Sequence, residues 1–439
     1  VAACLLTGAG LGQEKGRLER IEVAPVWAGC PVGFAMLTHT NRQFLAFYSA
    51  ERVMTLAQRD LTTNAWTFAE LPSRLGWDSH NYVTLALDGE GYLHVAGNMH
   101  CVPLIYFRGA KPLDICSMTP VHRMTGVREK RVTYPRFMKG PDGALLFTYR
   151  DGSSGNGSTL WNRYDLAAKA WSRLTDEPIF DGQGRMNAYP CGPVLGKDGY
   201  YHLTWVWRDT PACETCHDIS YIRSRDLVHW ENALGKPVPL PVRLGADVVV
   251  DPVPVKGGLI NPGQAIGFDV LGRVIVTYTK YDAAGNSQLM NARLENGAWK
   301  VYQTSDWDYR WEFSGGGSIV GEIGVGPVGL QEGVLAQSYS HATCGGGRWR
   351  LDEATLKPCG RMADPVPWPK EVGRKEHAAP GMSVRHASDL AADPETGVSC
   401  DGFRYIACWE SLPANRDRPQ PGGVPPPSRL RVYKVRAGK

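Results

Sequence analysis

Hydrophobic and polar residues alternate in short runs that begin directly after a turn. Four of these runs follow a turn made of Asp and Gly, and each is rich in the β-branched and aromatic residues that favour strands. The runs are residues 92–96, 144–149, 200–207 and 273–278. Their turns begin at Asp88, Asp142, Asp198 and Asp269, so successive turns lie 54, 56 and 71 residues apart. This spacing predicts a sheet unit that repeats along the chain.

A second pattern lies between these runs and predicts the outer strands of each unit. A strand-like run, a short polar turn and a Trp follow one another three times. The runs and their Trp residues are 161–165 with Trp171, 221–224 with Trp230, and 288–294 with Trp299. Each set has the pattern of a hairpin.

A repeat of this length is typical of the four-stranded blade of a β-propeller, which takes about 40–50 residues before insertions. We therefore predict an all-β fold, a single seven-bladed β-propeller over residues 16–439. Residues 20–26 and 429–435 are expected to close one blade together, because closure removes open sheet edges. A pair of β-sandwiches is the alternative, and the long, regular spacing disfavours it.

Composition and charge exclude several classes of protein. Hydrophobic residues make up 43% of the 439 residues and aromatic residues 10%, which is enough to build a core and excludes a disordered chain. The net charge of +4 gives no electrostatic basis for nucleic-acid binding. The 50 Gly and 31 Pro favour turns over long helices. We expect a monomer without a transmembrane segment.

The first residues suggest export from the cytoplasm. Residues 1–12 are small and apolar, and we interpret residues 1–15 as the remnant of a secretory signal peptide. The expected location is periplasmic or secreted. The run from Val1 to Cys4 is also similar to a lipoprotein cleavage site, so a lipid anchor stays open.

Cysteines add two further expectations. Export permits disulfides, and Cys101–Cys116 or Cys344–Cys359 could pair. Cys213, Cys216 and His217 could instead supply up to three ligands to a structural metal ion such as zinc. Catalysis itself is expected to need no cofactor.

Candidate catalytic residues gather at predicted blade ends. His80 precedes one strand of a predicted hairpin and His100 follows the other, so the two imidazoles should meet at its open end. Tyr134 and Arg150 hold the matching places in the next blade. Each residue alone could equally be structural, but four suitable types recur in order.

These four residue types suit β-elimination at a uronate. Histidine is an acid or base near neutral pH, arginine grips a carboxylate with two hydrogen bonds, and a tyrosine can exchange a proton once a cation lowers its pKa. Neutralising the uronate makes its C5 proton more acidic, so that a base can remove it while an acid protonates the departing 4-oxygen. Glycoside hydrolysis would require paired carboxylates, and the sequence shows no acidic pair beside these residues.

The stretch from residue 77 to 157 resembles the seven-bladed propellers of the BNR-repeat type that include ulvan lyases and L-rhamnose-α-1,4-D-glucuronate lyases. The resemblance extends over about residues 25–320. Its motifs are residues 80–82, 98–100, 103–108, 133–137, 149–157, 205–210, 217–218 and 281–288.

This resemblance implies that His80, His100, Tyr134 and Arg150 form the catalytic group, with Arg150 on the uronate carboxylate. Which of the other three is base and which is acid stays open, although a histidine base and Tyr134 as acid are favoured. The implied secondary substrate contacts are Asn81, Arg208 and His217. A sulfated rhamnose would need extra cations, for which the candidates are Arg131, Arg136 and Lys280.

The implied substrate is an acidic polysaccharide that contains rhamnose and uronate, either ulvan or the arabinogalactan side chains of gum arabic. Related propellers described as α-L-rhamnosidases use a His where this chain has Gln43, and an amide cannot titrate. Elimination is therefore favoured over hydrolysis. A glycoside hydrolase and a non-catalytic carbohydrate-binding propeller remain the alternatives.

Overall fold

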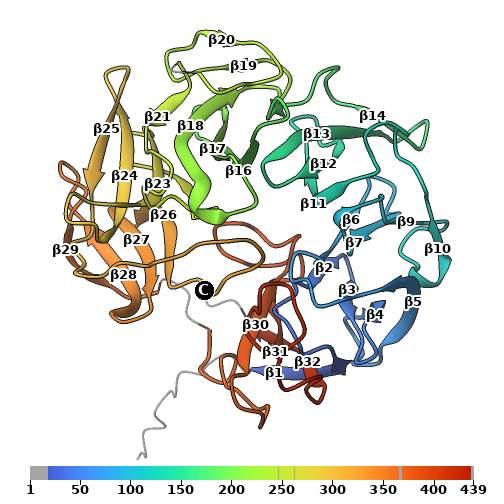
Figure 1. Cartoon of the computed structure of the whole chain (residues 1–439). Coiled ribbons are helices and arrows are strands. Elements are labelled where there is room, and N and C mark those ends of the chain that lie inside the picture. Colours follow the sequence, from blue (N-terminus) through green and yellow to red (C-terminus); the bar gives the residue numbers. More distant parts are fainter. Residues whose placement is uncertain (1–17, 246, 262, 365–367, 437–439) are drawn as a thin grey trace, which may run out of the picture.

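Antiparallel sheets make up the protein, for which we use a computed structural model that describes residues 18–245, 247–261, 263–364 and 368–436. Seven sheets occur within this part of the chain. They follow one another in sequence order around a ring (Figure 1). This arrangement confirms the all-β, propeller-type prediction.

The first three sheets contain the segments predicted to carry the site. Their strands, in the order of the chain, are β2 (Ala35–His39), β3 (Arg42–Tyr48), β4 (Val53–Asp60) and β5 (Thr67–Arg74); β6 (Val83–Leu87), β7 (Leu93–Gly97), β9 (Tyr106–Gly109) and β10 (Met118–Pro120); and β8 (His100–Val102), β11 (Val132–Lys139), β12 (Leu145–Ser153), β13 (Asn156–Asp165), β14 (Ala170–Arg173) and β15 (Phe180–Asp181). A short 3-10 helix, η1 (Ile115–Ser117), precedes β10.

The other four sheets complete the ring. Their strands are β16 (Asn187–Leu195), β17 (Tyr201–Arg208), β18 (Cys216–Ser224), β19 (Trp230–Glu231), β20 (Pro237–Val238) and β21 (Val249–Asp251); β22 (Ala265–Phe268), β23 (Val274–Tyr281), β24 (Ser287–Glu295) and β25 (Ala298–Gln303); β26 (Ile323–Gln331), β27 (Val334–His341), β28 (Gly345–Leu351) and β29 (Pro358–Met362); and β30 (Ser383–Ser388), β31 (Phe403–Ser411), β32 (Ser428–Arg436) and β1 (Glu19–Val26). A second 3-10 helix, η2 (Cys213–Thr215), lies between β17 and β18.

The predicted Asp/Gly turns join β6 to β7, β11 to β12, β16 to β17 and β22 to β23. Asp88 Oδ1 accepts the backbone N–H groups of Glu90 and Tyr92 at 3.0 and 2.9 Å. Asp269 Oδ1 accepts those of Leu271 and Arg273 at 3.0 and 2.9 Å. The carboxylate thus holds the turn closed from inside, which is why Asp recurs at the start of each repeat.

The predicted outer hairpins are also confirmed. Strand β13 pairs with β14, β18 with β19, and β24 with β25. The Trp of each hairpin, Trp171, Trp230 or Trp299, packs against a hydrophobic cluster. Aromatic side chains therefore fill the space between sheets, where they remove large apolar areas from water.

The two ends of the described chain close one sheet together, as predicted. Strand β1 pairs with β32 from Glu19 opposite Lys434 to Val26 opposite Ser428, and a bulge interrupts the register. The blue and red strands lie side by side at the bottom of Figure 1. Closure pairs the free edge of β32 and joins the first sheets to the last.

Some sequence predictions concern features other than the sheets. Residues 1–15, the predicted signal remnant, lie outside the described residues. Within the described part, no helix is long and apolar enough to cross a membrane. The expected disulfides are wrong in this structure, because Cys101, Cys116, Cys344 and Cys359 are all free thiols.

We predict that the closing sheet depends on a buried ion pair. Arg431 Nη2 lies 2.9 Å from Glu410 Oε1, and both side chains are only 1% exposed. Replacing Glu410 with Gln leaves Arg431 with only the partly exposed Glu376, 2.7 Å from its Nη1, as a counter-charge, and we expect a loss of about 3 kcal/mol in the free energy of unfolding. Urea unfolding measures this loss.

The control for this prediction is an exposed ion pair of the same kind. Arg310 Nε and Glu312 Oε2 lie 2.6 Å apart, with side chains 42% and 73% exposed. Glu312→Gln should change the free energy of unfolding by no more than about 1 kcal/mol. Equal losses in the two variants would contradict a special role for the buried pair.

Candidate active site

A cavity of about 740 Å³ lies among the inner strands and the loops that follow them. Its walls include one histidine, four tyrosines, three arginines and two serines. These residues are His80, Tyr82, Tyr134, Tyr149, Tyr189, Arg136, Arg150, Arg208, Ser79 and Ser318. Five of the eight residues predicted for the site, His80, Tyr134, Arg136, Arg150 and Arg208, therefore line a single cavity.

The two predicted histidines lie side by side, as the hairpin argument required. His80 precedes β6, whereas His100 opens β8 and pairs with Thr133 of the next sheet. Their ring centroids are 4.3 Å apart, with 32° between the ring planes. His80 lines the cavity, whereas His100 is not among its lining residues and packs against the His80 ring.

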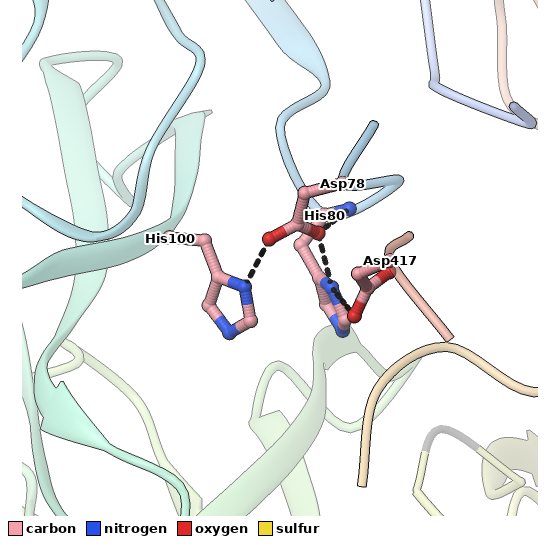
Figure 2. A group of neighbouring side chains, drawn as sticks. All are labelled: Asp78, His80, His100 and Asp417. Atoms are coloured by element: carbon pink, nitrogen blue, oxygen red, sulfur yellow. Dashed lines mark hydrogen bonds and ion pairs between the residues drawn. The ribbon is translucent and has the colours of Figure 1, made fainter. Parts of the chain in front are cut away.

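One carboxylate joins the two imidazoles. Asp78 Oδ1 lies 2.7 Å from His80 Nδ1, and Asp78 Oδ2 lies 2.5 Å from His100 Nδ1 (Figure 2). Burial opposes ionisation of Asp78, but the hydrogen bonds and charges of His100 and His80 outweigh it and hold the pKa of Asp78 well below its usual range. Asp78 is therefore an ionised acceptor for both rings.

A second carboxylate reaches the same place from the far end of the chain. Asp417 lies on the loop between β31 and β32, and its Oδ2 is 3.5 Å from His80 Nδ1. The backbone N–H of Ser318 donates to the same oxygen at 3.0 Å, and Ser318 Oγ lies 3.4 Å from His80 Nδ1. His80 thus contacts two acidic side chains, Asp78 and Asp417.

Tyr134 is aimed at the cavity by an irregularity in β11. The register between β11 and β12 shifts between Thr133 and Arg136, and Tyr134 has a φ of 59°. This left-handed backbone is uncommon for a bulky residue and costs about 1–3 kcal/mol, so the surrounding structure must hold it in place. The Tyr134 ring centroid lies 5.9 Å from that of His80.

Burial raises the pKa of the Tyr134 phenol above its usual value. The guanidinium of Arg150 lies 5.0 Å from the ring centroid and acts in the opposite direction, but it does not offset burial. The expectation that a cation lowers the pKa of Tyr134 is therefore wrong. The phenol stays protonated near neutral pH and is suited to donate a proton rather than to remove one.

Arg150 is a buried cation whose hydrogen-bond partners are neutral. It is 3% exposed and donates to Thr133 Oγ1 at 3.0 Å, Tyr189 Oη at 3.3 Å and Cys101 Sγ at 3.4 Å. Its Nε is buried without an acceptor in the described residues. A buried charge without a counter-ion is costly, so this position favours an anionic ligand.

A glycine makes room for this arginine. Gly157 lies on β13, and a Cβ at that position would sit 3.0 Å from Arg150 Cδ and 2.5 Å from Asn187 Oδ1. Packing therefore explains the glycine at position 157 of the motif, because a Cβ there would collide with the side chains of Arg150 and Asn187.

Arg208 and Arg136 extend the positive charge along the cavity wall. Arg208 donates to Asn261 Oδ1 at 3.0 Å, to Thr210 O at 3.1 Å and to the carbonyl of Pro211. Arg136 is exposed and donates to Gly192 O at 2.7 Å. All of these acceptors are neutral, so both side chains keep their charge available for an anion.

Two predicted substrate contacts are not among the residues that line the cavity. Asn81 lies beside β3, where its backbone carbonyl accepts a hydrogen bond from Tyr48 Oη at 2.6 Å. His217 is held by two carboxylates, Asp209 at 2.9 Å and Asp218 at 2.8 Å. Burial opposes its charged form, but the two acids raise the pKa of His217.

The predicted metal site at Cys213, Cys216 and His217 stays a prediction that this geometry does not favour. Both ring nitrogens of His217 already bind carboxylates, and Cys216 Sγ donates to Asn261 Oδ1 at 3.3 Å. Burial raises the pKa of Cys213 and brings that of Cys216 to about 12, which disfavours thiolate ligands.

Asp78, His80, His100 and Asp417 hold donor atoms within 4.8 Å of one another, the only such group of three or more in the described residues. Asp78 already hydrogen bonds to both histidines at 2.5 and 2.7 Å, so each Nδ1 has a partner without an ion.

The expectation that no acidic pair lies beside the histidines is wrong, because Asp78 and Asp417 form one. One oxygen of each lies within 4.8 Å of the other. Neither residue is among those that line the cavity, whereas the carboxyl pair of a glycoside hydrolase flanks the bond that it cleaves. This pair therefore supports the imidazoles.

The sequence of residues 42–307 matches the model of the BNR repeat-containing family. The chain belongs to this family. The match takes in Asp78, His80, His100, Tyr134 and Arg150, but it ends well before Asp417.

Solved structures similar to this chain include polysaccharide lyases. The chain is similar to the polysaccharide lyase Uly1, with a TM-score of 0.62 and 16% identity over 97% of this chain and 100% of that one. A polysaccharide lyase family 25 ulvan lyase bound to -[GlcA(1-4)Rha3S]- gives a TM-score of 0.56 and 13% identity over 90% and 97% of the two chains. At these identities the likeness shows a shared fold.

Curated relatives match over shorter segments. An ulvan lyase long isoform of Alteromonas sp. is 39% identical over 62 residues, which are 14% of this chain and 6% of that protein. An ulvan lyase short isoform of Alteromonas sp. (strain LOR) is 38% identical over 61 residues, 14% of this chain and 12% of that protein. These alignments span only a small part of either relative.

Sequence reasoning missed the two acids for different reasons. Asp78 lies two residues before His80, so its place in the motif could have revealed it. Asp417 is far away in the sequence. Ser79, which lies between Asp78 and His80, donates from Oγ to Asp417 Oδ1 at 3.4 Å across a separation of 338 residues, and only ring closure brings these segments together. Gln43, in contrast, is fully buried and bonds to Thr38 and Arg59, so it has a packing role.

We predict that Asp78 makes folding stability depend on acidic pH. A carboxyl whose pKa is lower in the folded than in the unfolded protein contributes stability above its unfolded pKa of about 3.9, and this is lost as the pH falls through the folded value. The wild type should therefore lose more stability than Asp78→Asn between about pH 5 and pH 2. Urea unfolding at several pH values measures the difference, and parallel curves would contradict it.

Proposed function

We propose that this protein is a polysaccharide lyase that cleaves a uronate-containing polysaccharide by β-elimination. The observation that carries this proposal is the buried, unpaired Arg150 beside Tyr134 in a cavity that His80 also lines. An anion acceptor, a protonated phenol and an imidazole are the three groups that elimination from a uronate requires.

The chemistry assigns one role to each group. Arg150 neutralises the uronate carboxylate and so makes the proton on C5 more acidic. An imidazole, for which His80 is the better placed because it lines the cavity, removes that proton. The electron pair forms the C4–C5 double bond as the C4–O4 bond breaks, and the Tyr134 hydroxyl protonates the departing oxygen. The products are a new reducing end, on the sugar that keeps the departing oxygen, and a 4,5-unsaturated uronate.

The substrate class follows from the charge of the cavity and from the relatives. Similar proteins are ulvan lyases, and one of them binds -[GlcA(1-4)Rha3S]-. We propose the L-rhamnose-α-1,4-D-glucuronate linkage, in ulvan or in gum arabic, as the bond that is cleaved. Of the cations considered for a sulfate group, Arg136 lines the cavity, whereas Lys280 is paired with Asp251 at 2.5 Å. An extracytoplasmic location, expected from residues 1–15, would suit such a polymer.

The test is to incubate the full chain with ulvan and, separately, with gum arabic. We expect the ultraviolet absorbance of an unsaturated uronate to rise with at least one polymer, since elimination creates a conjugated double bond. Release of rhamnose without this absorbance would identify a hydrolase. Binding of both polymers without any turnover would identify a carbohydrate-binding propeller, and either result would reject the lyase proposal.

Tyr134→Phe should separate proton donation from packing. The Phe ring keeps the contact with Arg150 but has no proton for the 4-oxygen, so kcat should fall about 10²–10⁴-fold while KM changes little. Tyr302→Phe is the matched control, because it removes a hydroxyl bonded to Glu295 outside the cavity. Unchanged kcat in Tyr134→Phe would exclude the phenol as the acid.

A further inference from the structure

Asp78 is a shared acceptor for two histidines, and this arrangement fixes where their protons lie. An ionised carboxylate can only accept hydrogen bonds, so each Nδ1 that contacts it must carry the hydrogen. In neutral imidazole the other ring nitrogen then has a free lone pair. His80 and His100 both therefore present a basic Nε2.

The surroundings of the two rings differ. His80 Nδ1 lies near Asp78 at 2.7 Å and Asp417 at 3.5 Å, whereas the carboxylate at His100 Nδ1 is Asp78 alone, at 2.5 Å. Figure 2 shows Asp417 on the side of His80 that faces away from His100. A proton taken up by His80 would thus be stabilised by two negative charges, and one taken up by His100 chiefly by one.

We propose that Asp78 and Asp417 are positioning residues that make His80 the general base, Asp78 by fixing its Nδ1–H tautomer and Asp417 by stabilising its protonated form. This inference rests on the proposed lyase function. Neither acid is among the residues that line the cavity, so they act through the imidazole and not on the sugar.

The role of His100 follows from the same contacts. Its ring centroid lies 4.3 Å from that of His80, so two imidazolium ions would repel each other at this distance. His100 therefore acts by packing against the His80 ring and by sharing its acceptor. Asp78 Oδ2 bonds to His100, and Asp78 Oδ1 bonds to both Nδ1 and the backbone N–H of His80, so the three side chains form one unit.

Other ionisable groups near this unit are few among the described residues. Tyr134 faces His80 with a ring separation of 5.9 Å, and Arg150 lies beyond it. Burial raises the pKa of Cys30 to about 11; Asp78 and Asp417 act in the same direction, and the charge of Arg385 acts against them. A neutral phenol and a neutral thiol leave the carboxylates as the dominant influence on His80.

Nitrogen-15 NMR of the histidines tests the assignment without any substrate. In the wild type we expect the His80 and His100 signals of the neutral Nδ1–H tautomer. Asp78→Asn should weaken the preference for this tautomer at both rings, because an amide can donate as well as accept, whereas Asp417→Asn should leave it in place. A dominant Nε2–H tautomer at His80 in the wild type, or an unchanged preference in Asp78→Asn, would overturn the proposal.

Enzyme kinetics test whether the two positioning acids affect catalysis. Asp78→Asn should reduce kcat about 10²–10⁴-fold with little change in KM, as expected when a base loses the group that orients it. Asp417→Asn should reduce kcat about 3–30-fold, because its contact is longer, and should move the acidic limb of the pH profile to lower pH. A loss of affinity with kcat unchanged would overturn the positioning role.

The matched control is an Asp–His pair of similar length on the surface. Asp226 Oδ2 lies 2.7 Å from His229 Nδ1, with side chains 49% and 86% exposed, and Asp226→Asn should leave kcat and the pH profile unchanged. Thermal unfolding checks that each variant is folded. If Asp78→Asn does not fold, the tautomer observed in the wild type alone tests the proposal.

Addition of zinc and of a chelator completes the test. Activity and His signals that do not respond to either support a hydrogen-bonded unit, whereas activity lost with the chelator and restored by zinc would show a metal site and overturn the proposal. If the wild type cleaves no polymer but the tautomers are as expected, the lyase function fails and the positioning of the two rings stands.

Discussion

Ring closure is the constraint on which the other features depend. Each sheet presents two faces that must be covered, and a ring lets every sheet cover its neighbours without leaving an open edge at the seam. The pairing of β1 with β32 completes this arrangement, and the buried pair of Arg431 on β32 and Glu410 on β31 ties β32 to the strand on its other side. Since inner strands from several sheets line the cavity, its shape is set by the ring as a whole.

The cavity combines two kinds of charge that are kept apart. On one wall, Arg150, Arg208 and Arg136 hydrogen bond to neutral groups and retain their positive charge. Beside His80, Asp78 and Asp417 do not line the cavity themselves, so their negative charge acts through an imidazole. An anionic sugar thus meets arginines and a base, without an acidic side chain among the residues that line the cavity.

Much of the fold could be predicted because its signals are local. The Asp of each repeat binds the turn that follows it, and the Trp of each hairpin lies a few residues from its partner strand, so both leave a periodic trace in the sequence. His80, His100, Tyr134 and Arg150 could be placed together for the same reason, since they lie at corresponding ends of adjacent hairpins.

The remaining features depend on long-range contacts or on burial, which no local pattern reports. Asp417 reaches His80 only when the ring has closed. The pKa of Tyr134 depends on how deeply the phenol is buried, and a nearby cation alone does not indicate its direction. The cysteines were misleading because spacing says nothing about whether two thiols face each other.

The position of Asp417 has a consequence for how the protein matures. During synthesis the segments that carry His80, His100, Tyr134 and Arg150 emerge well before Asp417, which lies on the loop between the last two strands in sequence. The strands that close the ring therefore also bring the second carboxylate to His80, and a chain truncated before β31 would lack that carboxylate.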